Sequence, residues 1–198
     1  MKSLILIRHG KPACGSSIFY GRTDVELSPE GKEQSEKLVD ILSKRSFKKV
    51  FSSPLRRCLY PAKLLSEKAG IPLEIREEIM ELDFGKWSGK SWEELSKKEE
   101  FSKFYTDENF RPPDGESLRE MKERIKSFIN YFLKNEEDGE FVCFTHSGVI
   151  RNFFILLFNL PINHYFTPKI DYLHLCQFDF YPDGLFVLSA WNCSLLED

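Results

Sequence analysis

The chain has 198 residues, a length that suits one well-packed domain and is short for two. Hydrophobic residues make up 41% of it and aromatic residues 14%, which excludes a disordered chain. The net charge of -3 argues against a nucleic-acid binder that relies on a general basic surface. We therefore expect one globular domain, residues 1–198, with no nucleic-acid partner.

The cysteines and the apolar stretches indicate the compartment. Five cysteines show neither CxxC pairing nor the spacing of a zinc site, so we expect reduced, mostly structural thiols. Residues 1–7 are too short for a secretory signal, and residues 153–160 are too short to span a bilayer. The sequence thus predicts a cytoplasmic protein without a membrane partner.

The first half of the chain reads as alternating strands and helices. The aliphatic run of residues 4–7 predicts a strand buried on both faces of a parallel sheet. Ser28 and Pro29 predict the N-cap and first position of a helix. Val50 and Phe51 then form a short strand, and residues 52–54 open a second helix that ends at Gly70–Pro72.

Residues 84–113 interrupt this alternation and form a cap-like insertion. Many charges accompany its aromatic residues, and Ser91 and Glu94 have the spacing of a helix capping box. The aromatic side chains predict either a substrate lid or packing of the insertion onto the domain, with equal weight. The aromatic residues are Trp87, Trp92, Phe101, Phe104, Tyr105 and Phe110.

The second half returns to the regular pattern. Ser117 and Glu120 repeat the capping box at the start of a long helix. Residues 141–144 predict another buried strand, a helix follows from Val149, and residues 172–190 predict a terminal hairpin. The fold class is therefore α/β, a three-layer α/β/α sandwich with a mostly parallel central sheet.

Two of the four histidines occupy equivalent places, each just after an apolar strand. His9 follows the first strand and is preceded by Arg8, while His146 follows the strand of residues 141–144. Because the carboxyl ends of strands form the ligand crevice of open α/β sheets, both imidazoles should face it. Residues 53–57 place Arg56 and Arg57 at a strand-to-helix junction, a natural anion site. Together these groups predict chemistry on a phosphoryl group.

Seven segments in order resemble the histidine phosphatase superfamily, also called the phosphoglycerate mutase-like family. The resemblance implies that His9 is the nucleophile, that Arg8, Arg57 and a protonated His146 hold the phosphate, and that Glu81 donates the proton. It implies substrate contacts from Gly10, Tyr20, Gly21, Arg22, Ser147 and Gly148, and neither a metal ion nor a cofactor. The segments are Arg8-His9-Gly10, Tyr20-Gly21-Arg22, Ser28 to Gly31, Ser53 to Arg57, Glu81 with Phe84 to Trp87, Gly115-Glu116-Ser117, and Thr145 to Gly148.

Neighbouring residues compete for two of these roles. Family spacing places Arg57 in the pocket and leaves Arg56 as a solvated neighbour. Asp83 and Glu78 compete with Glu81, and Asp83 is the preferred alternative. Two positions depart from the family pattern. Pro61 should kink or delay its helix. The loop after His9 lacks an asparagine found in many mutases, which Lys11 or the Ser16-Ser17 pair would replace.

These features predict a metal-independent phosphomonoester hydrolase that works through a phosphohistidine and takes a small-molecule phosphomonoester. Hydrolysis is favoured over a mutase reaction, because mutases of the family usually carry additional segments. Residues 18–24 look most like the loop of α-ribazole phosphatases. The alternatives are a broad-specificity phosphatase, a phosphoglycerate mutase-type phosphotransferase and an inactive phospho-ligand binding module. Both a monomer and a homodimer are compatible with the sequence.

Overall fold

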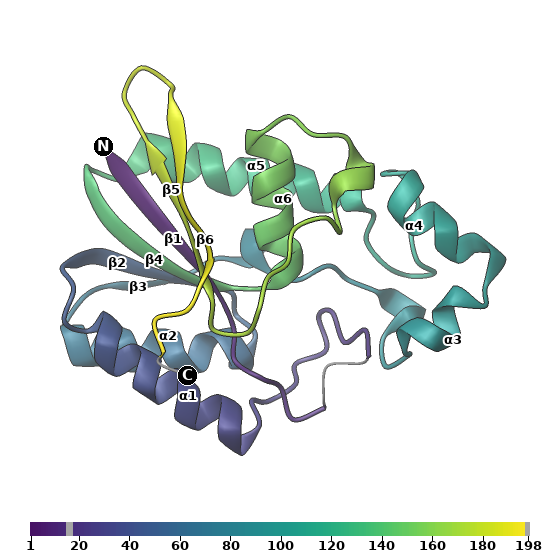
Figure 1. Ribbon diagram of the computed structural model, residues 1–198, viewed down its shortest axis with the longest axis horizontal. Helices are drawn as coiled ribbons and strands as arrows, with labels where there is room; N and C mark the ends of the chain where they lie inside the picture. The colour runs from purple at the N-terminus through teal and green to yellow at the C-terminus, as the bar shows by residue number, and fades with distance from the viewer. Residues whose placement is uncertain (15–17, 197–198) are drawn as a thin grey trace.

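The computed structural model describes residues 1–14 and 18–196, which form a central sheet with helices on both faces (Figure 1). The strand order is β3-β2-β4-β1-β5-β6. The pairings among β3, β2, β4 and β1 are parallel, while β5 and β6 are antiparallel to their neighbours. The strands are β1 (Lys2–Arg8), β2 (Phe47–Ser52), β3 (Leu73–Ile75), β4 (Gly139–Thr145), β5 (Leu175–Phe180) and β6 (Phe186–Cys193).

Helices α1 and α2 cover one face of the sheet, and α5 and α6 cover the other (Figure 1). The α/β sandwich with a mostly parallel sheet is thus confirmed. The α-helices are α1 (Pro29–Leu42), α2 (Arg56–Ala69), α3 (Trp92–Ser96), α4 (Lys103–Thr106), α5 (Leu118–Asn135) and α6 (Ser147–Leu157). Single-turn 3-10 helices are η1 (Glu77–Ile79), η2 (Gly85–Trp87), η3 (Glu99–Ser102) and η4 (Ile162–His164).

The aliphatic run of β1 contributes to two separate cores. Leu4 and Leu6 pack in the cluster that includes the buried sides of α5 and α6. Ile5 and Ile7 pack on the opposite face, in the cluster with α1 and α2. All four side chains are fully buried, because successive side chains of a strand point to opposite faces and both faces are covered.

The three helix starts predicted from capping residues, at Ser28, Ser91 and Ser117, are confirmed. The Ser28 side chain accepts a hydrogen bond from the amide of Gly31, and proline occupies the first turn of α1. Both capping boxes form, one at the start of α3 and one at the start of α5. Side-chain oxygens thereby satisfy amides that the first helical turn would otherwise leave without acceptors.

Helix α2 differs from the prediction in two respects. It begins at Arg56 rather than at residues 52–54, and it continues through Pro61 without a break. Proline removes only one hydrogen bond of the helix. The side chains of Cys58, Pro61, Ala62 and Leu65 are all buried, so packing against the sheet holds the helix in place. The short strand β3, which the sequence did not reveal, follows α2.

The segment of residues 84–113 lies at one end of the molecule as a group of short helices (Figure 1). Trp87, Phe101 and Phe104 are buried in the same core as α5 and α6. Trp92 stays 47% exposed. Most of the buried aromatic surface therefore packs the segment onto the sandwich, and Trp92 is left at its surface.

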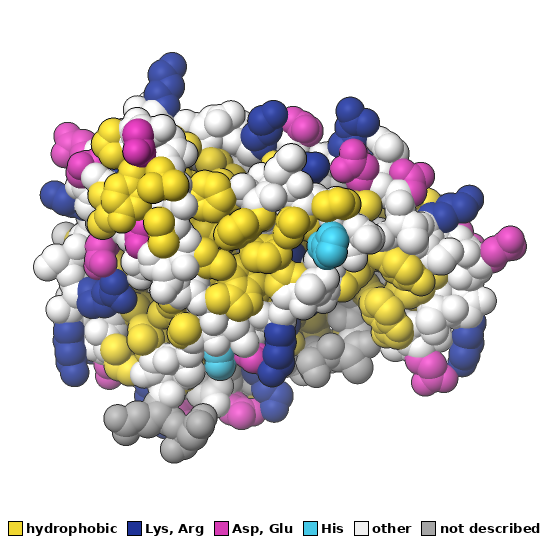
Figure 2. Space-filling view, turned by 45° about the horizontal axis from the view of Figure 1, so that its top comes forward, with side chains coloured by type: hydrophobic (Ala, Val, Ile, Leu, Met, Phe, Trp, Pro, Cys, Tyr) yellow, Lys and Arg dark blue, Asp and Glu magenta, His cyan; other side chains and the backbone are white. Residues whose placement is uncertain are grey.

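Hydrophobic side chains also gather on the outer surface, over the face made by α6 and the β5–β6 hairpin (Figure 2). The exposed large hydrophobic residues of this region include Phe158, Tyr181, Leu185 and Val187. Among the helices of the described ranges, none is long and apolar enough to cross a membrane.

Candidate active site

The parallel pairing of β1 with β4 brings His9 and His146 together. Arg8 is the register partner of Thr145, so the residue after each strand leaves the sheet at the same point. The amide of His9 donates to the Thr145 carbonyl at 2.9 Å. The two imidazole ring centres lie 5.3 Å apart. Residues separated by 137 positions thus share one site at the carboxyl edge of the sheet.

The backbone orients the His9 ring. Its Nδ1 atom lies 2.7 Å from the Gly10 carbonyl oxygen, an acceptor that requires the proton on Nδ1. Burial, together with the positive charges of Arg57 and Arg8, holds the pKa of His9 well below its usual 6.5. The ring is therefore neutral near pH 7, with an unprotonated Nε2 available for attack.

Arg8 is fixed beside this nucleophile. Its Nη1 donates to the Ile170 carbonyl at 2.7 Å, and its guanidinium carbon lies 3.7 Å from the ring centre of Tyr172. Its Nε is buried and has no acceptor among the described residues. Buried donors are normally paired, so this N–H indicates a site for an external acceptor.

Arg57, in the first turn of α2, is held in the same way as Arg8, by backbone carbonyls that accept from its Nη atoms. Its side chain is fully buried, with Nη1 donating to Thr23 and Nη2 to Gly21 carbonyls at 2.9 and 2.6 Å. Its Nε likewise lacks an acceptor among the residues described. Arg56 points outward and forms exposed ion pairs with Asp24 and Glu26. The structure thus places Arg57, not Arg56, in the site.

His146 is fully buried on the other side of His9. Its Nε2 lies 2.8 Å from Ser53 Oγ, at the end of β2. Burial and the charge of Arg57 hold its pKa well below the usual 6.5. In the free protein the His146 imidazole is therefore neutral, because a second buried cation next to two arginines is strongly disfavoured. The protonated His146 expected with a bound phosphoryl group stays a prediction.

Glu81 reaches the site from the segment after η1. Its Oε1 accepts from the amide of Leu82 at 3.0 Å, and its Oε2 accepts from the amide of Gly148 at 3.1 Å. The residue is only 8% exposed and lines the cavity. Asp83 is used elsewhere, since its Oδ1 accepts from the Gly85 amide. The geometry therefore favours Glu81 as the carboxyl group facing the substrate.

Two arginines and a carboxylate hold the Glu81 segment. Arg124 donates to the carbonyls of Glu78 and Met80 at 2.6 Å and to the Glu81 carbonyl at 3.1 Å. It also forms a two-point ion pair with Glu116. Arg22 bonds the same two partners, the Glu81 carbonyl at 3.3 Å and Glu116 at 3.1 Å. Glu116, from the Gly115-Glu116-Ser117 segment, thus links α5 to the backbone of the proton-donor candidate.

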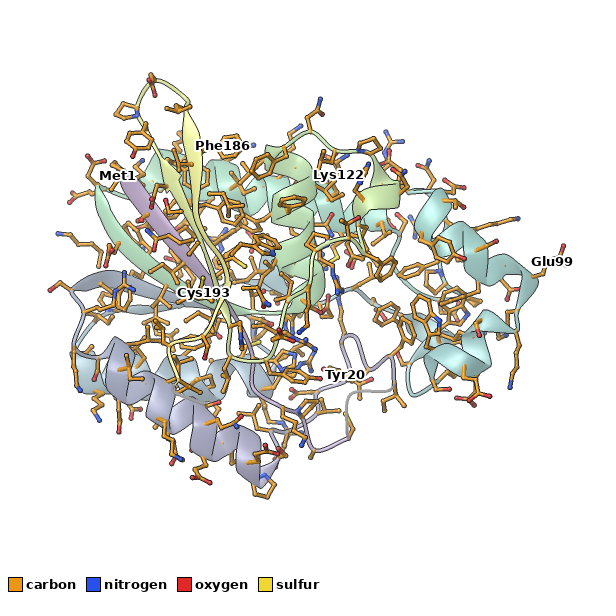
Figure 3. The ribbon with its side chains drawn as sticks, in the orientation of Figure 1. Met1, Tyr20, Glu99, Lys122, Phe186 and Cys193 are labelled. Atoms are coloured by element: carbon orange, nitrogen blue, oxygen red, sulfur yellow. The ribbon has the colours of Figure 1, made fainter. Side chains whose placement is uncertain are left out.

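A cavity of about 760 Å³ lies against these groups, and Arg8 and Glu81 line it. His9, Arg57 and His146 are buried and are not among its lining residues. Tyr20 and Tyr172, which do line it, lie next to the His9 ring. Four of the predicted substrate contacts line the cavity, and Figure 3 shows Tyr20 among the converging side chains at the centre of the molecule. Gly10 and Arg22 occupy other places: Gly10 packs on α1, and Arg22 is paired with Glu116. The lining residues from that prediction are Tyr20, Gly21, Ser147 and Gly148.

Neither candidate replacement for the missing asparagine is found among the residues that line this cavity. Lys11 is exposed and paired with Glu30 at 2.7 Å. The Ser16-Ser17 pair lies outside the described residues.

The sequence missed several lining residues that come from the irregular segment 158–174 and from α6. Tyr172 lies 5.7 Å from His9, ring centre to ring centre, and Tyr165 is buried beside Gly148. Arg151 and Phe166 also line the cavity. The segment has no periodic pattern, so no signal indicated which of its side chains face inward. Arg151 lies in the helix predicted from Val149 and one turn after Ser147, so spacing could have revealed it.

A buried neutral histidine beside two arginines, whose Nε donors lack acceptors among the described residues, is an arrangement suited to a phosphoryl group. The model of the histidine phosphatase superfamily (branch 1) matches residues 4–194. The chain belongs to this superfamily and is a phosphatase.

Named relatives include several phosphatases. Phosphoserine phosphatase 1 of Hydrogenobacter thermophilus is 28% identical over 86% of this chain and 83% of its own. Adenosylcobalamin/alpha-ribazole phosphatase of Escherichia coli is 26% identical over 85% of each chain. Phosphoserine phosphatase of Entamoeba histolytica, solved with 3-phosphoglyceric acid, superposes with a TM-score of 0.87 over 98% of each chain at 27% identity.

Proposed function

We propose that the protein hydrolyses small phosphomonoesters in two steps through a phosphohistidine on Nε2 of His9. The observation that carries this proposal is the neutral imidazole of His9, held by Gly10 through Nδ1 and placed between Arg8 and Arg57. A phosphoryl group there would meet the two unpaired Nε donors of these arginines. Phosphoryl transfer depends mainly on positioning and charge stabilisation, which this arrangement supplies.

In the first step, Nε2 of His9 attacks phosphorus, forming an N–P bond as the P–O ester bond breaks. The protonated Glu81 carboxyl donates its proton to the departing alcohol oxygen. In the second step, a water molecule attacks phosphorus and gives a proton to the Glu81 carboxylate, and the N–P bond breaks. Inorganic phosphate leaves, and His9 and Glu81 return to their initial states. The two guanidinium groups balance the charge on the phosphoryl oxygens throughout.

Two candidate substrates differ in size and charge, so they would contact different parts of the cavity. α-Ribazole phosphate carries a planar ring, which the stacked Phe19 and Trp92 at the cavity wall would accept. Phosphoserine, named for the Hydrogenobacter relative, is smaller and carries a carboxylate. Both are primary-alcohol esters, so the same transfer chemistry would act on either.

The test is phosphate release from p-nitrophenyl phosphate, α-ribazole phosphate and phosphoserine by the wild type and by His9→Ala. Turnover should fall by about a thousandfold or more in His9→Ala, because the covalent route is lost. His164→Ala is the matched control, since His164 is exposed and outside the cavity lining. Undiminished turnover in His9→Ala would refute the mechanism, and conversion of 3- to 2-phosphoglycerate without phosphate release would indicate a mutase.

A further inference from the structure

Arg151 is a cation at the cavity that the transfer chemistry does not use. It lies on α6 and lines the cavity together with Ser147 and Gly148. Its Nε donates to the Pro168 carbonyl at 3.3 Å. No carboxylate of the described residues lies within ion-pair distance of it, although 19 ion pairs form elsewhere in these residues.

Neighbouring rings hold the Arg151 side chain. Its guanidinium carbon lies 5.5 Å from the ring centre of Phe166 and 5.9 Å from that of Tyr165. With Nε engaged by Pro168, the Nη edge is left for another partner. That edge presents two parallel N–H groups, the arrangement that matches the two oxygens of a carboxylate.

The position of Arg151 on α6 places it near the point where the leaving group would depart. The amide of Gly148 donates to the carboxyl group of Glu81. In the proposed reaction this carboxyl group gives its proton to the departing ester oxygen, so that oxygen must lie next to it. Arg151 follows Gly148 by three positions, so the two are neighbours on one helix face, about 5–6 Å apart. An anionic group a few bonds from the ester oxygen would therefore reach Arg151.

We call the cavity lining other than Arg8, Glu81, Ser147 and Gly148 the outer wall; besides Arg151 it contains one charged residue, which is already paired. Glu93 lines the cavity, but its carboxylate is highly exposed and paired with Lys97 at 3.0 Å. The outer wall, as far as the structure describes it, therefore offers one cation without an ion pair, one paired carboxylate, and a surface that is mainly aromatic. Such a wall favours a leaving group with a single anionic substituent over a neutral or cationic one.

We propose that Arg151 is a specificity-determining residue that selects phosphomonoesters whose leaving group carries a carboxylate close to the ester oxygen. The proposal rests on the proposed phosphatase reaction at His9. It predicts a preference for 3-phosphoglycerate over glycerol 3-phosphate and for phosphoserine over phosphoethanolamine. Each pair differs at the carboxylate and keeps the same type of ester.

The experiment compares kcat/KM for both pairs in the wild type, Arg151→Met and Arg151→Lys. Competitive inhibition of p-nitrophenyl phosphate hydrolysis by the same four compounds measures the preference even where turnover is slow. The wild type should prefer the carboxylated member by about tenfold to a hundredfold, the range of a charge-assisted hydrogen bond. Arg151→Met should abolish the preference and Arg151→Lys should keep part of it.

Arg45→Met is the matched control, because Arg45 pairs with Glu140 outside the cavity lining. It should leave the preference as in the wild type. A merely structural Arg151 would lower both members of each pair equally, and that result would overturn the proposal. So would a wild type without preference in either pair. If the wild type itself showed no turnover that depends on His9, the proposed reaction would be refuted instead. The two failures are therefore distinguishable.

Discussion

The amide of Gly148 donates a hydrogen bond to Oε2 of Glu81 at 3.1 Å, joining the first turn of α6 to the segment after η1. The contact requires glycine, because a Cβ at position 148 would lie 2.1 Å from Glu81 Oε1 and 2.7 Å from Tyr165 Oη. Any side chain at this position must therefore displace the carboxyl group that we propose as proton donor.

Gly148→Ala should accordingly lower kcat by about a hundredfold or more, since general acid catalysis contributes on that order. Overpacking of the buried site should also lower stability by about 1–3 kcal/mol. Steady-state kinetics and thermal unfolding measure the two effects. Gly184→Ala, in the hairpin turn where a Cβ meets nothing within 4 Å, is the control for kcat and should leave it unaltered. Its φ of 85° strains alanine, so this variant should also lose some stability while keeping its kcat. Wild-type kcat in Gly148→Ala would show that Glu81 need not hold this position.

Replacement of Glu81 by Gln should produce a loss that depends on the leaving group. An amide cannot deliver a proton to a departing alkoxide, so hydrolysis of alkyl phosphates should fall by about 100- to 10,000-fold. p-Nitrophenolate leaves without protonation, so the first step with p-nitrophenyl phosphate should be much less affected. Single-turnover kinetics with both esters test this. Equal losses for the two leaving groups would assign Glu81 a role other than general acid.

The two buried histidines should make the protein less stable as the pH falls below 6.5. Burial lowers the pKa of both His9 and His146 in the native state, whereas both titrate near 6.5 when the chain unfolds. Below pH 6.5 the unfolded state therefore binds more protons, and the free energy of unfolding decreases. For two groups the slope approaches about 2.7 kcal/mol per pH unit.

Urea unfolding between pH 7 and pH 5.5 measures this slope. His9→Asn should reduce it to about half, because one of the two buried imidazoles is removed. A free energy of unfolding that stays constant over this interval would mean that the two histidines take up protons in the native state just as they do in the unfolded chain, so that burial does not lower their pKa.

Arg124 should stabilise both the fold and the position of Glu81. Its side chain is 15% exposed and that of its ion-pair partner Glu116 is 12% exposed. Arg124 also donates hydrogen bonds to the backbone carbonyls of Glu78, Met80 and Glu81. Arg124→Met should lower the free energy of unfolding by about 3–5 kcal/mol, the usual effect of removing one partner of a buried pair. It should also lower kcat, because the Glu81 backbone loses an anchor.

The control is Arg111→Met, which removes an ion pair with Glu120 whose partners are 60% and 42% exposed. Exposed pairs contribute little, so Tm should hardly change. If both variants had the same small effect on Tm and kcat, the Arg124 contacts would have no structural importance.

The sequence was most informative where a local pattern determines the structure. Ser28 and Pro29 predicted the start of α1, and the aliphatic run of β1 predicted a strand covered on both faces. The pairing of His9 with His146 followed from two similar strand ends in a parallel sheet. These features depend on periodicity, caps and topology, which neighbouring residues encode.

The rest depends on tertiary contacts that no local pattern encodes. The neutral state of His146 results from its burial beside Arg57 and could not be deduced from the residue type. Tyr172 reaches His9 from an irregular segment, and Arg22 turns to Glu116 rather than into the cavity. Three-residue β3 gains its stability from pairing with β2, not from its own composition.

The most direct test of the mechanism is to trap the phosphoenzyme. In Glu81→Gln, p-nitrophenyl phosphate should still phosphorylate His9, while loss of the base for water should slow the second step. After rapid quenching at alkaline pH, mass spectrometry should find one phosphoryl group on His9, labile in acid. The double variant with His9→Ala should carry none. A phosphoryl group on any other residue, or full turnover by His9→Ala without a phosphoenzyme, would contradict the mechanism.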